Sequence, residues 1–159
     1  MNEADDERLM RAAVEKTREG IKKGQTPFGA CISKDGMVVS CRHNTVWRGT
    51  DITAHAEINA IRDACRKLKT IDLSSCVIYS TCEPCPMCYS AIHWARISKI
   101  AYGCGIKDAQ DAGFNELGIP AKKMKSLSKD KTRVVGGLLK DECRKLFAEW
   151  KKNKRRRPY

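Results

Sequence analysis

Apolar positions near the start of the chain follow two different spacings, which predict one helix and then a pair of strands. Residues 5–20 carry apolar side chains three and four positions apart and stop at Gly20, as an amphipathic helix followed by glycine does. Residues 28–33 and 37–41 are rich in apolar and β-branched side chains, and an Asp-Gly pair lies between them. Asp-Gly favours the tight turn of a β-hairpin, so we expect the two strands to pair antiparallel.

The rest of the chain continues to alternate between helical and strand patterns. The expected elements are a helix of about fifteen residues from Thr53, a strand at 76–81, a helix from Pro86 to about residue 96, a strand at 99–104, a weak strand at 132–135 and a last helix at 139–150. Residues 105–131 are polar without a clear period and are expected to be irregular. This order predicts an α/β fold, a three-layer α/β/α domain built on a mostly parallel or mixed sheet of about five strands.

Length and composition are those of one globular domain with a charged extension. The chain has 159 residues, 42% of them hydrophobic and 31% charged, so residues 1–150 are expected to form a single domain. Residues 151–159 hold six basic side chains and no acid, half of the net charge of +12. A charge this positive makes a nucleic acid or another acidic partner the first hypothesis. The tail itself has three interpretations: a solvated end, a lid over an active site, or an arm that binds RNA.

Nothing in the sequence predicts export or a membrane anchor. The chain lacks the run of about 18 apolar residues that a transmembrane helix requires, and its first ten residues are acidic and polar, unlike a secretory signal. We therefore expect a cytoplasmic protein without membrane association. In that reducing compartment the nine cysteines are expected to ligate metal or to be buried as small apolar side chains, and not to form disulfides.

Two short segments hold the residue types of a metal centre, each at the expected start of a helix. His55 and Glu57 lie in the first segment, and Cys85 and Cys88 lie in the second. The two cysteines are three positions apart across a first helical turn, where both sulfurs can point to one place and the helix dipole favours thiolates. Two thiolates and the imidazole of His55 would leave a tetrahedral zinc ion with one open position, as in catalytic zinc sites. That position would hold water, and Glu57 would shuttle its proton.

A closed, non-catalytic zinc site is the competing interpretation, because Cys-x-x-Cys pairs also occur in structural zinc knuckles and redox pairs. A closed site needs a fourth ligand, for which His43, His93 and Cys82 are the candidates. The remaining cysteines are interpreted as core or strand residues: Cys31, Cys41, Cys65, Cys76, Cys104 and Cys143.

Together the two segments resemble the motifs of zinc deaminases. Residues 55–57 read His-Ala-Glu and residues 84–88 read Pro-Cys-Pro-Met-Cys, which match the H-A-E and P-C-x-x-C motifs without a gap. The chain is similar to members of the cytidine deaminase-like superfamily from about Pro27 to Phe114. The resemblance implies Zn²⁺ as cofactor and a mixed five-stranded sheet between helices. It also implies attack of zinc-bound hydroxide on a ring carbon that bears an exocyclic amine, with release of ammonia.

Within that superfamily the chain resembles two branches, the guanine and guanosine deaminases and the tRNA adenosine deaminases. Residues 51–57 resemble both. Residues 27–30 and 81–85 are more similar to the guanine branch, and so is the Ala-Gly-Phe segment at 112–114, which an acid follows. Residues 134–150 are closer to the ending of nucleoside and tRNA deaminases in general.

The resemblance also implies which residues hold the substrate. Glu116 is similar to an acid of the guanine branch, commonly aspartate there, and a carboxylate at this place could accept the adjacent N1–H and exocyclic N–H of guanine. Asn44 matches an asparagine that holds the base, and Ala56 lies between the histidine and glutamate of the first motif.

Aromatic side chains complete the expected pocket. Phe28 and Trp94 are candidates to pack on the ring of the base, with ordinary core packing as the alternative for both. Tyr159 resembles the terminal residue with which guanine deaminases close the site, through a C-terminal segment that can be exchanged between the subunits of a dimer.

These observations favour a zinc-dependent aminohydrolase of a purine base or nucleoside, with guanine to xanthine as the preferred reaction. The alternatives within the superfamily are deamination of the wobble adenosine of tRNA to inosine, and deamination of cytosine or cytidine. The expected partners are a small purine and a second copy of the chain in a homodimer, with RNA as an alternative partner. A hypothesis of a different class is a non-catalytic RNA-binding protein with a closed zinc site and a basic surface.

Overall fold

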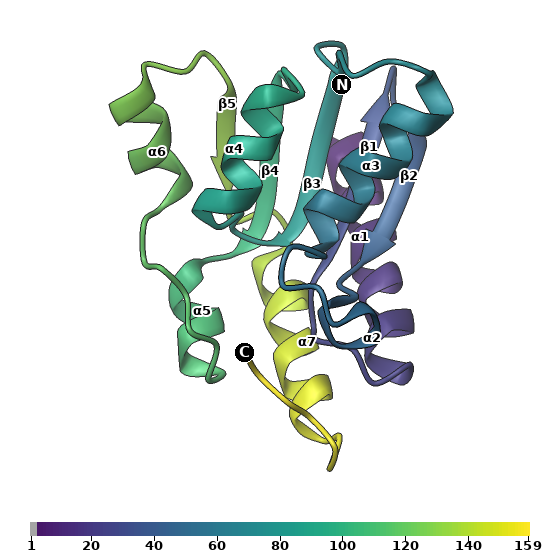
Figure 1. Cartoon of the computed structure of the whole chain (residues 1–159), viewed down its shortest axis with the longest axis vertical. Coiled ribbons are helices and arrows are strands. Elements are labelled where there is room, and N and C mark those ends of the chain that lie inside the picture. The colour runs from purple at the N-terminus through teal and green to yellow at the C-terminus, as the bar shows by residue number, and fades with distance from the viewer. Residues whose placement is uncertain (1–2) are drawn as a thin grey trace.

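One five-stranded sheet forms the centre of the computed structural model, which describes residues 3–159 (Figure 1). The strands are β1 (Gly29–Lys34), β2 (Met37–His43), β3 (Cys76–Cys82), β4 (Lys99–Cys104) and β5 (Arg133–Gly136), in the spatial order β2-β1-β3-β4-β5. β1 pairs antiparallel with both β2 and β3, whereas β3 with β4 and β4 with β5 are parallel. The predicted mixed sheet of five strands is therefore confirmed.

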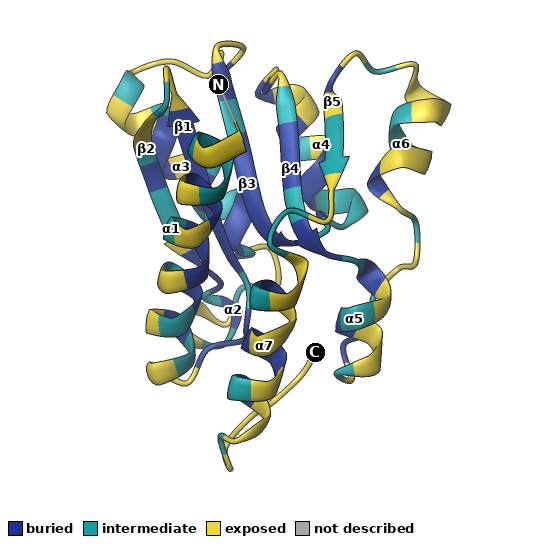
Figure 2. Ribbon diagram, turned by 180° about the vertical axis from the view of Figure 1, so that it is seen from behind, coloured by how far each residue is buried: buried dark blue, intermediate teal, exposed yellow. Residues whose placement is uncertain are grey.

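Helices cover both faces of this sheet and give the expected three layers (Figures 1 and 2). One face is covered by α1 (Glu3–Lys22) and α7 (Lys140–Lys151), and the other by α3 (Ala56–Leu68), α4 (Pro86–Trp94) and α6 (Ala121–Ser128). Each face has its own buried cluster of apolar side chains. The two clusters hold the sheet in place by burial of apolar surface from both sides.

The first helix and hairpin follow directly from the sequence pattern. The apolar positions of α1 from Leu9 to Val14 are buried against β1, β2 and β3. Asp35 and Gly36, the two residues between the paired strands, both have positive φ, at 51° and 76°. A two-residue loop with this geometry matches the twist of the strands, which is why Asp-Gly occurs there.

Close packing of α1 on β1 depends on the absence of a side chain at Gly29. A Cβ atom at this position would lie 2.7 Å from the main-chain oxygen of Ala13, and it would also overlap the hydroxyl of Thr17. The Thr17 hydroxyl donates to the same Ala13 oxygen at 2.8 Å, so moving it aside would break this buried hydrogen bond. Gly29 thus sets the distance between α1 and the sheet.

Residues 105–131 differ from the prediction, because they contain α5 (Ile106–Asp111) as well as α6. Both helices are held by contacts distant in sequence: the carboxylate of Glu83 accepts the main-chain N–H of Ile106 at 3.4 Å and that of Ala121 at 2.9 Å. A further short helix, α2 (Val46–Gly49), follows β2. Helices of four to eight residues are stabilised by such tertiary contacts and not by an apolar period of their own, so the pattern did not show them.

No helix within residues 3–159 is both long enough and apolar enough to cross a membrane.

Candidate metal centre and substrate pocket

The two motifs are brought together because α3 and α4 begin at the same end of the sheet. His55 is the residue before α3 and has extended backbone angles, φ −63° and ψ 159°. Cys85 holds the same position before α4, with φ −64° and ψ 167°, and Pro86 follows as the first helical residue. Cys88 lies in the first turn of α4, so β3 and the loop after it deliver both sulfurs to the place where α3 starts.

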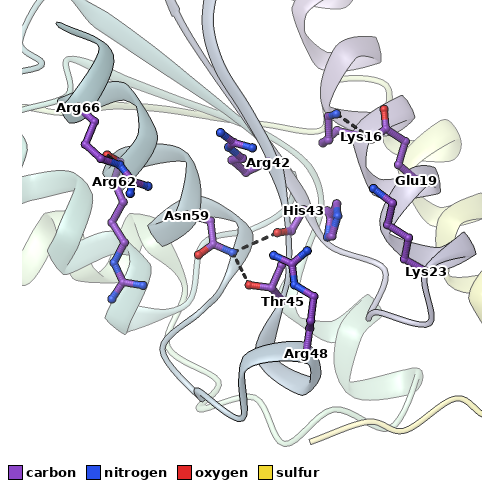
Figure 3. A pocket seen from close by; sticks show the side chains of 10 residues that line it. All are labelled: Lys16, Glu19, Lys23, Arg42, His43, Thr45, Arg48, Asn59, Arg62 and Arg66. Atoms are coloured by element: carbon purple, nitrogen blue, oxygen red, sulfur yellow. Dashed lines mark hydrogen bonds and ion pairs between the residues drawn. The ribbon is translucent and has the colours of Figure 1, made fainter.

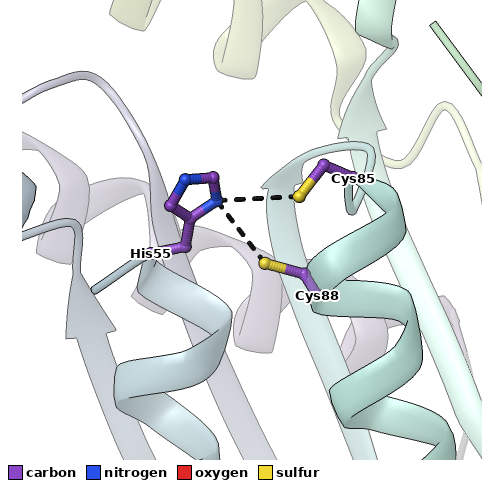
Figure 4. Close-up of side chains that lie close together, drawn as sticks. All are labelled: His55, Cys85 and Cys88. Atoms are coloured by element: carbon purple, nitrogen blue, oxygen red, sulfur yellow. Dashed lines mark hydrogen bonds between the residues drawn. The ribbon is translucent and has the colours of Figure 1, made fainter. Parts of the chain in front are cut away.

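The ligand atoms of His55, Cys85 and Cys88 converge on one point (Figure 4). Nδ1 of His55 lies 3.7 Å from Sγ of Cys85 and 3.5 Å from Sγ of Cys88, and all three atoms lie within 4.8 Å of one another. A tetrahedral zinc ion with Zn–N and Zn–S bonds of about 2.05 and 2.3 Å places nitrogen and sulfur about 3.6 Å apart. The three residues therefore fit zinc with one tetrahedral position left open.

The chemical state of the cysteines agrees with a cation site. A hydrogen bond from Cys88, together with one from His55, lowers the pKa of the Cys85 thiol to about 4. The same contact with Cys85, and burial, raise the pKa of the Cys88 thiol well above its ordinary value. Two thiol groups this close compete for one negative charge, and a metal cation removes the competition by stabilising both thiolates.

Glu57 lies beside this centre and outside the set of three ligands. Its carboxylate is buried, one oxygen accepts the hydroxyl of Ser80 at 2.9 Å, and the other lies 3.5 Å from Sγ of Cys88. Burial raises the pKa of Glu57 above the ordinary range. A buried carboxyl group with a raised pKa and a fixed orientation is suited to accept a proton and to release it again.

None of the three candidates for a fourth ligand joins the centre. Nδ1 of His43 is 2.7 Å from the main-chain oxygen of Asn44, and Nδ1 of His93 is 3.2 Å from the carboxylate of Asp130. The thiol of Cys82 donates to the main-chain oxygen of residue 105 at 3.6 Å. Among residues 3–159 the one group of potential ligands found is His55, Cys85 and Cys88, so none of the three candidates is placed as a fourth ligand.

A pocket of about 300 Å³, here called the substrate pocket, opens over the metal ligands. Glu116 lines it together with His55 and Cys85, and burial raises the pKa of this carboxyl group to about 7. The remaining lining residues are Ile52, Pro86, Met87, Asn115, Leu117 and Tyr159. A smaller void of about 10 Å³, lined by Glu57 and Phe28 among others, adjoins the same residues His55, Cys85 and Glu116. The substrate pocket thus combines apolar walls with the carboxyl group of Glu116, and the carboxyl group of Glu57 lines the adjoining void.

The C-terminal segment runs back along the molecule after the end of α7 (Figure 1). Its last residue, Tyr159, lines the substrate pocket of its own chain. The ring of Tyr159 lies 5.6 Å from that of His55 and 5.5 Å from that of Phe114, between ring centroids. Its hydroxyl accepts the side-chain amide of Asn44 at 2.6 Å, and its main-chain oxygen accepts the N–H of Asn115 at 2.9 Å. Asn44 is fully buried and contacts the pocket residue Tyr159, but it lines neither the substrate pocket nor the small void.

The structure places the other three predicted pocket residues, Phe28, Ala56 and Trp94, in three different environments. Phe28 lines the small void and packs edge-on against Phe114, with centroids 4.8 Å apart. The side chain of Ala56 is buried in the apolar cluster under α3, and Ala56 lines neither the substrate pocket nor the small void. Trp94 is not brought to the pocket: it lies at the C-terminal end of α4, opposite Cys85, and is 81% exposed.

Two positioning residues were not found by sequence reasoning. Ser80 orients Glu57 from β3, and Glu83 ties the loop that carries Cys85 to the starts of α5 and α6. A polar residue inside an otherwise buried strand, two positions before the strand ends, was the available signal for Ser80. For Glu83 no local signal exists, because its partners lie 23 and 38 positions further along the chain.

Comparison with known proteins gives a consistent picture. Residues 3–104 match the cytidine and deoxycytidylate deaminase zinc-binding region. Guanine deaminase of Bacillus subtilis is 44% identical over 111 residues, which cover 69% of this chain and 71% of that protein. The tRNA-specific adenosine deaminase of Buchnera aphidicola subsp. Schizaphis graminum is 31% identical over 150 residues, 94% of this chain and 96% of that protein.

Structural comparison agrees with the sequence comparison. The solved structure of guanine deaminase from Nitrosomonas europaea superposes with a TM-score of 0.84 at 30% identity, covering 92% of this chain and 85% of that one. The similarity extends beyond the motifs to the arrangement of the whole fold.

Proposed function

The chain belongs to the cytidine and deoxycytidylate deaminase family, and from that premise we propose that it hydrolyses guanine to xanthine and ammonia. The choice of guanine rests on the position of Glu116, whose side chain lines the same pocket as the metal ligands His55 and Cys85. Guanine presents N1–H and an exocyclic N–H side by side, and one carboxylate can accept both. Adenine has no N1–H, so it would leave part of this acceptor unpaired.

The size and cover of the pocket support a free base as the substrate. The pocket has a volume of about 300 Å³, at the lower end of the range for small-molecule sites. Tyr159 lines it and is held from two sides, by Asn44 and by Asn115. A nucleoside or a polynucleotide would need more room at this mouth than a base does.

His55, Cys85 and Cys88 are the residues that would hold zinc. When bound, zinc lowers the pKa of a coordinated water molecule toward neutrality. The attacking water supplies two protons. Glu57 carries one to the amine, which leaves as ammonia when the C–N bond breaks, and the other ends on a ring nitrogen as the new carbonyl forms, so the carboxyl group ends the cycle as it began. Ser80 holds one oxygen of Glu57 in place for both transfers.

The test is release of ammonia from guanine, guanosine, adenosine, cytosine and cytidine, with and without a zinc chelator. We expect release from guanine that the chelator abolishes. Glu116→Gln should lower kcat/KM for guanine about a hundredfold, because hydrogen bonds to a charged acceptor contribute about 1.5–3 kcal/mol, and Glu116→Asp should retain more activity. Glu15→Gln, the same substitution on the exposed side of α1, serves as the control. Absence of activity on guanine would refute the assignment of the base.

A second candidate, deamination of adenosine in tRNA, is favoured by a different observation. A broad groove of about 750 Å³, here called the tail groove, is lined by Lys154, Arg155, Arg156 and Arg157 together with Trp47 and four residues around them. Such a combination of cations with an aromatic side chain is typical of grooves that bind single-stranded nucleic acid. Formation of inosine in a tRNA anticodon stem-loop, without activity on guanine, would support this candidate instead.

The homodimer with an exchanged C-terminal segment stays a prediction. In the structure the segment covers the pocket of its own chain. Light scattering of the purified protein would show whether a dimer forms. Mixing a Glu57→Gln chain with a chain that lacks residues 151–159 would then show exchange, because only an exchanged segment could restore activity.

A further inference from the structure

A second pocket, of about 330 Å³, lies on the side of the molecule formed by α1, β2, α2 and α3 (Figure 3). We call it the cationic pocket, because six of its ten lining residues are basic and only Glu19 is acidic. The basic residues are Lys16, Lys23, Arg42, Arg48, Arg62 and Arg66. None of the ten belongs to the substrate pocket.

Half of these cations have no carboxylate partner in the described part of the chain. Lys16 pairs with Glu19 at 2.8 Å, Arg42 with Asp63 at 2.7 Å, and Arg62 lies 3.9 Å from Asp51. No ion pair within residues 3–159 involves Lys23, Arg48 or Arg66. Cations gathered around one concavity repel one another, and an anion bound among them would remove that cost.

The floor of the cationic pocket is polar and rigidly held. The side-chain amide of Asn59 donates to the main-chain oxygen of His43 at 3.1 Å, to the hydroxyl of Thr45 at 2.9 Å and to the main-chain oxygen of Ala54 at 3.1 Å. These bonds join β2, the segment before α3 and α3 itself. A site whose polar groups are already fixed loses little entropy when a ligand binds.

The pKa of the His43 imidazole is affected by the positive charge around the cationic pocket. Burial lowers its pKa, and the nearby Lys23, Arg48 and Lys16 lower it further. Its Nδ1 is 2.7 Å from the main-chain oxygen of Asn44, so this nitrogen carries the proton of the neutral ring. The neutral ring adds no positive charge, and the attraction for an anion comes from the lysines and arginines.

We propose that the cationic pocket binds a chain of linked phosphate groups, as found in nucleoside di- and triphosphates and in inorganic polyphosphate. Arginine donates two parallel N–H groups to phosphate oxygens, and the pocket has four arginines on three different elements. The excess of cations over Glu19 matches several linked negative charges better than a single one. This site is independent of the identity of the base that the substrate pocket accepts.

A small phosphorylated ligand fits the cationic pocket better than a strand of RNA does. Sites for single strands combine cations with aromatic faces on which bases stack. In the cationic pocket the only aromatic lining residue is His43, whose ring is buried, with 8% of the residue exposed. Trp47 lies in the adjoining tail groove, where the guanidinium of Arg157 covers its ring at 4.0 Å.

The experiment is calorimetric titration of the zinc-loaded protein with tripolyphosphate, ATP, GTP and orthophosphate at about 0.15 M salt, where exposed long-range attraction is screened. We expect saturable binding of one tripolyphosphate per chain, at least about tenfold tighter than orthophosphate because several charge-assisted bonds form together. Equal affinity for tripolyphosphate and the nucleotides would identify the phosphate chain as the whole ligand. Tighter binding of the nucleotides would show that the nucleoside contributes as well.

Two matched pairs of substitutions locate the site. Arg62→Gln with Arg66→Gln removes two exposed cations of the cationic pocket that do not line the tail groove, and we expect it to weaken tripolyphosphate binding about tenfold or more. Lys122→Gln with Lys123→Gln removes the same charge from exposed positions on α6, at the opposite edge of the sheet, and should change binding less than about twofold. Unchanged melting temperatures would show that all variants are folded. Equal losses in both pairs, or no saturable binding of tripolyphosphate, would overturn the proposal.

A third pair distinguishes the small ligand from RNA. Lys154→Gln with Arg155→Gln alters only the tail groove, so it should leave tripolyphosphate binding unchanged. If this pair weakens binding as much as the pair in the cationic pocket, and if affinity for single-stranded RNA rises with its length, the two regions form one nucleic-acid surface. That result would overturn the proposal in favour of RNA.

Discussion

Ser80 is expected to control the acid–base chemistry of Glu57 although it cannot react itself. Its hydroxyl donates to the buried carboxylate of Glu57 at 2.9 Å, and Ser80 is itself only 2% exposed. Ser80→Ala therefore removes a donor from a place where the rest of the fold leaves little room for a replacing water molecule. The other oxygen of Glu57 keeps its contact with Cys88, so the carboxyl group stays near the metal ligands.

The size of the effect follows from the kind of hydrogen bond that is lost. A hydrogen bond to a charged group contributes about 1.5–3 kcal/mol, which corresponds to about a ten- to hundredfold change in an equilibrium. The bond favours the ionised form of Glu57, whose pKa burial already raises. Without the hydrogen bond from Ser80, the pKa of Glu57 rises further. A smaller fraction of Glu57 is then ionised at neutral pH and able to accept a proton from water. Turnover at neutral pH should fall about ten- to hundredfold.

The assay is ammonia release measured from pH 5 to pH 9, together with the zinc content of each variant. For Ser80→Ala we expect the acidic limb of the profile to move to higher pH, with partial recovery of activity at the alkaline end and with zinc retained. Ser33→Ala makes the same substitution at a residue 1% exposed on the neighbouring strand β1, and it should leave the profile in place. A Ser80→Ala profile that is lower at every pH but unmoved would refute the argument, because loss of packing alone has no reason to depend on pH.

Three further changes test other parts of the structure. Asp63→Asn should destabilise the protein by about 1–3 kcal/mol at pH 7 and by less at pH 3, as urea unfolding would show, because Arg42 holds the pKa of this buried carboxyl group low despite burial. The stability from the ionised Asp63 is present above the ordinary aspartate pKa of about 3.9 and is lost as pH falls through lower values. Tyr159→Phe leaves the buried amide of Asn44 without its acceptor, so KM should rise about tenfold with a smaller change in kcat, measured by steady-state kinetics. Gly29→Ala would place Cβ 2.7 Å from a main-chain oxygen of α1, and the free energy of unfolding should fall by about 1–3 kcal/mol.

The parts of the fold that the sequence predicted well are those in which neighbouring residues determine the structure. The Asp-Gly turn requires positive φ at both positions and receives it, and the strand predicted at 99–104 has these bounds in the structure. The metal ligands were found for the same reason. His55 and Cys85 each precede a helix, and Cys88 follows one turn later, so a local pattern contains most of the geometry.

The parts that the sequence did not predict depend on contacts between distant segments. α5 and α6 begin where the carboxylate of Glu83 accepts their first N–H groups, and nothing within residues 105–131 indicates this. Trp94 illustrates the opposite error. An aromatic residue in a helix that carries two metal ligands looks like part of the pocket, but α4 has nine residues and its last turn ends far from its first.

In the structure, the positive charge of the chain is concentrated in two regions, the C-terminal tail and the cationic pocket. Half of it lies in the tail, whose last residue is tied to Asn44 and Asn115 and whose Arg157 covers Trp47, so the tail is folded against the molecule. Much of the remainder is gathered in the cationic pocket, which shares Lys23 and Arg48 with the tail groove. Because both regions attract anions, the salt dependence of binding by the unmodified protein would not distinguish them. Only paired substitutions that change one region at equal net charge can assign a bound anion to its site.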